Sequence, residues 1–487
     1  MKTNGWQLRR LATGVVLAGA LVAPLEGCAR NPVTGERELA LISEEQEIAM
    51  GRQAAQEAAQ SMGLVQDEEL QQYVQRVGLD LAKQSERPNL PWSFAVIDDP
   101  VPNAFALPGG FIFVTRGMMN LMNSEAELAT VLGHEIGHVT ARHSVSQMSK
   151  AQLANLGLGL GSILAPEIAQ QYGQIAGAGL QLLFLKYGRD DERQADELGF
   201  KYALAENYDV TQMADVFAAL QRLGESSGQS ATPAWLSTHP NPGERVETAR
   251  QRAAALPTPQ TNPVVDRAQY LRQIDGLVYG ENPRNGFFRE GEFIHPDLRF
   301  RMSFPRGWQT QNTAQAVLGG SPDQDALIQL TLAQGSDPAS AARAFLSQQG
   351  IQAGQTFQES INGIPAAGSY FRAQTEQGVL EGIVAYFTHG SNTYQLLTYT
   401  PAGRLERYDR LFREVVGSFR PLTDPALLNV QPARVSVVRT DRRETIAEFA
   451  RRTNSKVPAE ELALINQIPS ASSTVEAGTM LKTVVQK

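Results

Sequence analysis

The sequence has little cysteine, little histidine and no basic stripe, and each shortage excludes a class of protein. One cysteine among 487 residues rules out a disulfide within the chain. Lysine and arginine number 43 against 51 acidic residues, and no basic run interleaves with aromatic residues, which excludes a usual nucleic-acid surface. Histidine occurs only 6 times, so closely spaced histidines are not expected by chance.

The beginning of the chain has the pattern of an export signal. Three basic residues precede an apolar stretch at 11–25, which is shorter than a comfortable membrane span. The stretch leads through Glu26 to Cys28 and resembles a bacterial lipoprotein cleavage site, although Glu26 stands where a small uncharged residue is preferred. The resemblance implies lipidation of Cys28, and Ala29 after it implies the outer membrane. A plain secretory signal or a retained anchor is the alternative.

The chain is too long for one core, and its patterns change along its length. Residues 43–280 are mainly helical, with strands around a Gly-rich turn at 103–115 that predict a small sheet. Residues 151–186 are rich in Leu, Ala, Gly and Gln, and we expect close-packed helices there; membrane contact or self-association is the alternative.

Two further segments follow. Residues 286–422 combine two helical stretches with strands expected at 299–304, 326–332, 370–375, 379–388 and 393–399. They predict an α+β domain, whose opening is similar to a PsbP/Mog-like domain. Residues 430–487 have the order strand, helix, helix, strand, which is similar to a LysM-like glycan-binding module. A plain accessory domain explains the pattern of residues 430–487 as well.

The motif His134-Glu-Ile-Gly-His138 lies in an expected helix that begins at Ser124 with a capping box. Helix positions four apart share a face, so both imidazoles can reach one metal ion. Glu135 is then placed to act on a metal-bound water. This pattern predicts a zinc site with two nitrogen ligands and a general base from one turn.

Catalytic zinc usually takes a third protein ligand. Metzincins place it at a position that is Ser144 here, which cannot serve, and His143 would face away on a continuous helix, as a surface or packing residue. Glu192 and Asp196 share a face of a later helix. Glu192 can ligate the metal and Asp196 can bond the outer nitrogen of His134 or His138. An acidic helix start stabilised by its dipole is the competing explanation.

Together these segments resemble the gluzincin metallopeptidases of the HtpX, BepA and CAAX prenyl protease type. The resemblance covers roughly residues 29–255 and includes Asn31–Gly35, Asn103–Gly110, His134–His143 and Ser237–Pro240. It implies zinc on His134, His138 and Glu192, with Glu135 as the base. Because the chain shows neither tetratricopeptide repeats nor clean spans, it is most similar to the periplasmic lipoprotein members.

Two further features are candidates for the reaction. His239 could donate to the oxyanion, could instead close the open position of the zinc, or could be part of a structural His-Pro turn. Arg245 could assist. The strand that contains Asn103 and Phe105 could bind an extended substrate by backbone pairing, or could belong to an ordinary core hairpin.

We therefore expect an α+β multidomain protein with a signal peptide (1–27), a tether (28–42), a zincin-type metallopeptidase domain (43–280), an α+β domain (286–422) and a LysM-like module (430–487). The expected function is a zinc endopeptidase, one Zn²⁺ per chain, acting on misfolded or unassembled envelope proteins in the bacterial periplasm. The expected partners are those proteins, the membrane through a lipid anchor, and peptidoglycan as a further candidate. The alternative is a chaperone or assembly factor for outer-membrane proteins with a silenced zinc.

Overall fold

The computed structural model describes residues 28–39, 41–153, 187–226, 235, 238–239, 242–335, 337–375 and 378–486. The expected export signal and most of the Gly-rich segment at 151–186 lie outside these residues. Among the helices that are described, none combines the length and the apolar character that crossing a membrane requires.

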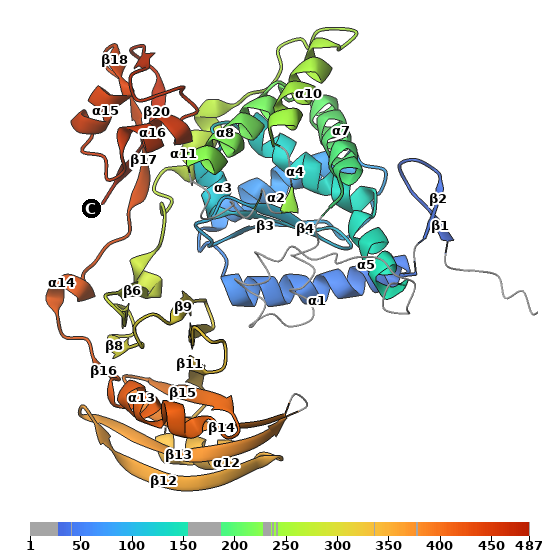
Figure 1. The fold of residues 1–487 in the computed structure, drawn as a ribbon. Helices are drawn as coiled ribbons and strands as arrows, with labels where there is room; N and C mark the ends of the chain where they lie inside the picture. The colour runs from blue at the N-terminus through green and yellow to red at the C-terminus, as the bar shows by residue number, and fades with distance from the viewer. Residues whose placement is uncertain are drawn as a thin grey trace, which may run out of the picture.

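The first unit packs helices against a three-stranded sheet of order β3-β5-β4 (Figure 1). Strand β3 (Ser93–Ile97) runs parallel to β5 (Phe111–Thr115), and β4 (Ala104–Leu107) runs antiparallel to it. A short hairpin of β1 (Cys28–Arg30) and β2 (Arg37–Leu39) precedes them. The helices are α1 (Glu44–Met62), α2 (Glu68–Lys83), α3 (Arg116–Leu121), α4 (Glu125–Thr140), α5 (His143–Leu153), α7 (Arg189–Ala205), α8 (Gln212–Ser226), α10 (Pro242–Ala254) and α11 (Arg267–Ile274). The expected helical unit with a small sheet is confirmed.

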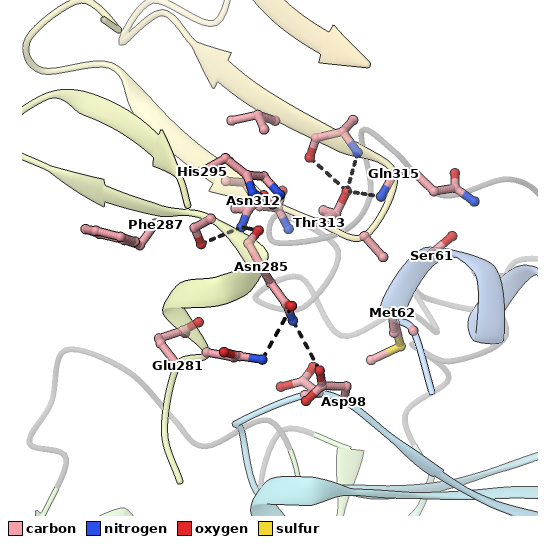
Figure 2. Close-up of a pocket in the computed structure, with 18 of the residues that line it drawn as sticks. Ser61, Met62, Asp98, Glu281, Asn285, Phe287, His295, Asn312, Thr313 and Gln315 are labelled. Carbon is pink, nitrogen blue, oxygen red and sulfur yellow. Dashed lines mark hydrogen bonds between the residues drawn. The ribbon is translucent and has the colours of Figure 1, made fainter. Parts of the chain in front are cut away.

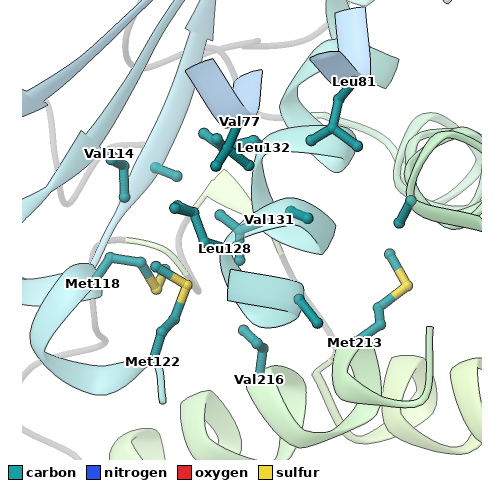
Figure 3. Close-up of a cluster of buried hydrophobic side chains, with 14 of the residues drawn as sticks. Val77, Leu81, Val114, Met118, Met122, Leu128, Val131, Leu132, Met213 and Val216 are labelled. Atoms are coloured by element: carbon teal, nitrogen blue, oxygen red, sulfur yellow. The ribbon is translucent and has the colours of Figure 1, made fainter. Parts of the chain in front are cut away.

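Helix α4 is the centre of this unit, and all of its residues are buried. Leu128, Val131 and Leu132 pack among side chains of α2, α3, β5 and α8 (Figure 3). The helix begins where Ser124 accepts a hydrogen bond from the Glu127 backbone nitrogen. A helix that is buried on every side holds its side chains in fixed directions, which suits it to carry a site.

The end of α4 differs from the expectation that one helix continues to Arg142. The helix stops at Thr140, and Arg142 has the left-handed φ of 60°, which is uncommon outside glycine. Two bonds hold this conformation: Arg142 Nε donates to Glu47 and its Nη2 donates to the Ile42 carbonyl. The chain therefore changes direction, and α5 starts at His143.

The segment after residue 286 is rich in strands. A seven-stranded antiparallel sheet has the order β12-β13-β14-β15-β11-β10-β9, and a smaller sheet has the order β16-β8-β7-β6. The strands are β6 (Phe287–Arg289), β7 (Glu292–His295), β8 (Phe300–Ser303), β9 (Gln309–Asn312), β10 (Ala316–Gly320), β11 (Leu327–Ala333), β12 (Ile351–Ile361), β13 (Ile364–Thr375), β14 (Gly378–His389), β15 (Asn392–Pro401) and β16 (Arg420–Pro421). Helices α12 (Pro338–Leu346) and α13 (Leu405–Gly417) pack on opposite faces of the large sheet. A single 3₁₀ turn, Pro283–Asn285, leads into this region.

The last segment returns to the first unit (Figure 1). After the short α14 (Pro425–Leu428), it contains β17 (Arg434–Arg439), β18 (Glu444–Thr445), α15 (Ile446–Arg452), α16 (Ala459–Ile465), β19 (Thr474–Val475) and β20 (Met480–Val485). Leu464 is buried in the core of the first unit, and the Asn123 side chain donates to the Ile465 carbonyl. Residues 434–485 are therefore packed against the helical unit and not separate from it.

Candidate metal centre

Four buried side chains bring one ligand atom each to a common point: His134, His138, Glu192 and His239. These atoms all lie within 4.8 Å of one another. His134 Nε2 is 3.0 Å from His138 Nε2 and 3.3 Å from His239 Nδ1. Glu192 Oε1 is 2.9 Å from the same His239 nitrogen. Three separate elements thus converge on one position.

The separations suit the corners of a zinc tetrahedron. Zinc binds nitrogen at about 2.0–2.1 Å, which places neighbouring ligand atoms roughly 3.3 Å apart. The Glu192 carboxylate lies 3.7 Å from His134 Nε2 and 3.5 Å from His138 Nε2, close to that edge length. Three imidazoles and a carboxylate are also the donors that zinc prefers. The residues present therefore fit one zinc ion.

Close packing of α4 on α7 lets Glu192 reach the two histidines of α4. A side-chain carbon added at Gly199 would lie 2.7 Å from the backbone nitrogen of His134, and one at Gly137 would lie 3.0 Å from the Ala195 Cα. The first distance is shorter than real contacts of this kind, and the second is tighter than most of them. Glycine at these positions therefore sets the spacing of the two helices.

Glu135 follows the first histidine and is fully buried. Neither of its carboxylate oxygens has a hydrogen-bond partner in the part of the chain that the structure describes. Burial raises the pKa of Glu135, and His239 and His134 oppose this rise. An acceptor that is free of other bonds beside the metal ligands is suited to take a proton from water.

Asp196 and Arg245 lie behind the ligands. Asp196 Oδ1 is 2.9 Å from His134 Nδ1, the nitrogen that faces away from the cluster. Arg245 Nη2 is 2.6 Å from Asp196, and its Nη1 is 3.1 Å from Glu192 Oε2. Burial raises the pKa of Asp196, but Arg245 and His134 more than offset this and bring it below its usual value. The result is an ionised carboxylate that can orient His134.

The electrostatics keep two of the ligands, His138 and Glu192, in their metal-binding forms. Burial, followed by the neighbouring His134 and His143, holds the pKa of His138 well below its usual value, so its imidazole is neutral. Burial alone would raise the pKa of Glu192, but His239 and Arg245 lower it below the usual value. A neutral imidazole and an ionised carboxylate are the forms that bind zinc.

Three residues near the ligands were not identified from sequence. The expectation that His143 faces away is wrong, because the bend at Arg142 returns its Nδ1 to within 2.9 Å of His138 Nδ1. Tyr187 stacks on His138 with ring centres 3.9 Å apart, and Trp235 stacks on His239 at 4.9 Å. Both aromatic residues lie in segments without helical or strand periodicity. Only their position in the sequence could have indicated them, since Tyr187 comes shortly before α7 and Trp235 shortly before His239.

A separate cleft lies between the first unit and the strand-rich segment. Its volume is about 970 Å³, and none of the four ligand residues lines it. Asn285 reaches across it to Asp98, as Figure 2 shows. Asn103 and Phe105 line this cleft, and the Phe105 ring packs on Phe113 in the small core beside α1. Asn103 and Phe105 thus line a cleft that is separate from the ligand cluster, and their expected role in substrate binding stays a prediction.

Comparison with known proteins agrees with this geometry. The family model described as Peptidase family M48 matches residues 68–253. The chain is 32% identical over 271 residues to the beta-barrel assembly-enhancing protease of Yersinia pestis, covering 54% of each chain. It is 31% identical over 216 residues to the Escherichia coli K12 protein of the same name, covering 43% of this chain and 44% of that one. The mitochondrial metalloendopeptidase OMA1 of Arabidopsis thaliana is 33% identical over 171 residues, which is 35% of this chain and 33% of that protein.

The chain spans about half the length of the beta-barrel assembly-enhancing protease relatives that it matches. Among solved structures, cyanobacterial PsbP from Synechocystis sp. PCC 6803 covers 27% of this chain and 91% of that one, with 13% identity and a TM-score of 0.23. A likeness of that size supports no statement about function. The M48 match contains His134, His138 and Glu192, so residues 68–253 are similar to peptidase family M48, and the buried cluster within them suits one zinc ion.

Proposed function

We propose that this chain is a zinc-dependent endopeptidase. One observation carries the proposal: His134, His138 and Glu192 converge as ligands, and beside them lies the carboxylate of Glu135, which accepts no hydrogen bond from the residues that the structure describes. The M48 match over the same residues supports it.

The residues have separate roles in this proposal. Zinc, when bound, acidifies a water and polarises the scissile carbonyl. Glu135 accepts the proton of that water and returns it to the leaving amine. Asp196 fixes the orientation of His134, and Arg245 holds Asp196 and Glu192 in place. An extended substrate pairs with β4, an edge strand of the small sheet.

The proposed substrates are misfolded or unassembled proteins of the bacterial envelope. The names of the relatives from Yersinia pestis and Escherichia coli, which refer to β-barrel assembly, support this class. We also propose lipidation of Cys28 and a place on the periplasmic side of the outer membrane, on the sequence pattern alone. Peptidoglycan binding by residues 430–487 is a further proposal; failure of this segment to be retained by cell-wall sacculi would reject it.

A second function has its own supporting observation. His239 Nδ1 lies 3.3 Å from His134 Nε2, among the candidate ligand atoms, and as a fourth ligand it would take the position where a catalytic zinc keeps a water. Its Nε2 also lies 3.7 Å from Glu135. In this arrangement His239 would silence the metal, and the chain would act as a chaperone or assembly factor until His239 withdraws.

Glu135→Gln tests the peptidase. The change removes the base but keeps the ligands, so zinc content should be unchanged and cleavage of an unfolded model protein should fall by about 10²–10⁴-fold. Wild-type cleavage rates in the mutant would contradict the proposal.

His239→Ala separates the two functions of that side chain. A silencing histidine predicts faster cleavage in the variant, because the fourth position opens. A donor to the oxyanion predicts slower cleavage, by about 10²–10³-fold. Zinc content measured on the same samples ensures that the comparison is made at equal metal loading.

A further inference from the structure

His138 contacts a second histidine through the nitrogen that faces away from the cluster. Its Nδ1 lies 2.9 Å from His143 Nδ1, and His143 Nε2 lies 2.9 Å from Gln194 Oε1. His143 is 4% exposed, so water does not readily replace either contact. The three side chains form one line from the ligand cluster toward the surface of α7.

Metal binding by His138 determines which atoms donate and which accept in this line of hydrogen bonds. If zinc takes His138 Nε2, the proton of the neutral ring must be on Nδ1. His138 Nδ1 then donates, so His143 Nδ1 must accept and the His143 proton must be on Nε2. That proton is donated to Gln194 Oε1, which accepts. The reverse direction would put a proton on His138 Nε2 and prevent metal binding.

We propose that His143 and Gln194 are positioning residues that hold His138 in its metal-binding tautomer. Neither residue touches the metal or substrate. The proposal depends on the zinc site but not on peptide hydrolysis, and it adds a partner for His138 to the one that Asp196 provides for His134.

The fold explains why this partner is available. The left-handed Arg142 ends α4 and starts α5 with His143 beside the last turn of α4. Gln194 is on α7, two residues after Glu192, so the same helix supplies a metal ligand and the last residue of this line of hydrogen bonds. Asp191, also on α7, lies 3.8 Å from His143 Nε2 and favours a proton on that nitrogen.

The test is zinc affinity, measured by competition with a chromogenic chelator on the full chain. His143→Leu removes the acceptor and should weaken zinc binding by about 10–100-fold. His143→Asn places an amide oxygen near the position of Nδ1 and should recover most of that loss. Gln147→Ala removes another contact between α5 and α7, to Asp191, without touching His138 and should leave affinity unchanged.

Gln194→Leu tests the other end of this line of hydrogen bonds, at a position that is only half-buried. It should weaken zinc binding in the same direction as His143→Leu. The proposal is overturned if His143→Leu folds and binds zinc as tightly as the parent. If His143→Leu does not fold, the same result for Gln194→Leu overturns it. It is also overturned if His143→Asn loses as much affinity as His143→Leu. If the affinity changes occur but the parent protein does not hydrolyse peptides, the result counts against the peptidase alone.

Discussion

At the scale of single residues, Arg245 is the buried cation that balances the candidate metal centre. Its guanidinium contacts Asp196 and Glu192 and lies over the rings of Phe217 and Trp235, 4.1 and 4.5 Å from their centres. Burial lowers the pKa of Arg245, but Asp196 and Glu192 raise it above its usual value. The arginine therefore stays charged and neutralises carboxylates that would otherwise repel each other.

Arg245→Gln should destabilise the metal-free protein by about 3–5 kcal/mol, because it leaves two buried carboxylates without their partner. Added zinc should reduce the loss, since the ion neutralises Glu192. Urea unfolding with chelator and with zinc measures both values. Arg193→Gln is the matched control: its pairs with Asp190 and Glu244 are exposed, and little change is expected. Equal losses with and without zinc would contradict this account.

The residues that sequence could predict are those with a fixed spacing on one helix. His134 and His138, like Glu192 and Asp196, share helix faces that periodicity reveals. His143 could not be placed in this way, because a left-handed arginine with no glycine nearby gives no signal of a helix end. The wrong prediction for His143 shows that spacing cannot assign a residue to a helix face when the helix ends before that residue.

At the scale of elements, the contact between α4 and α7 determines whether the site exists. The two helices come from distant parts of the sequence, and each carries ligands. Gly133 and Gly199 face each other, with the Gly199 carbonyl 3.0 Å from where a Gly133 side chain would begin. A change in helix separation would move Glu192 relative to both histidines.

Gly199→Ala should destabilise the protein by about 1–3 kcal/mol through overpacking and should weaken zinc binding. Denaturant unfolding and metal competition provide the measurements. Gly417→Ala is a matched control, since nothing lies within 4 Å of an added side chain at that helical position. It should be neutral or slightly stabilising. If the two variants behave alike, close helix packing does not set the geometry of the site.

Elements were predictable where burial alternates or repeats. Residues of β14 pack alternately into two cores, Ile383 and Ala385 on one face and Val384 and Tyr386 on the other, and this strand was expected. Strand β12 was not expected, because no residue along Ile351–Ile361 is buried and the polar residues Gln355 and Glu359 interrupt the apolar alternation. A strand at the edge of a sheet carries little of the pattern on which such predictions depend.

At the scale of the whole molecule, Lys482 joins the last segment to the helical unit. Its fully buried ammonium group donates to the carbonyls of Asn120 and Met122, at 2.7 and 2.8 Å. Gln467 also donates to Glu127, in the first turn of α4, at 2.6 Å. The order strand, helix, helix, strand was predictable from sequence, but this docking was not, because a lysine is normally expected at the surface.

Lys482→Met should lower the free energy of unfolding by about 2–5 kcal/mol, because buried carbonyls lose their donor. Lys456→Met is the control, since that lysine is exposed. Guanidinium unfolding of both proteins, followed by far-ultraviolet circular dichroism, decides the outcome. Equal stability of the two variants would mean that the last segment does not brace the helical unit.

The chain leaves the helical unit and returns to it through adjacent backbone. Gly276 donates to the Val435 carbonyl, Val435 donates to that of Leu277, and Tyr279 donates to that of Ala433. In the sequence, the strand-rich segment is thus inserted between the helical unit and the last segment that packs on it. Since chains emerge from the ribosome with the N-terminal part first, the ligands of the metal centre are made long before Lys482. We expect the helical unit to lack this brace during synthesis, so that full stability of the metal centre comes only when nearly the whole polypeptide has been made.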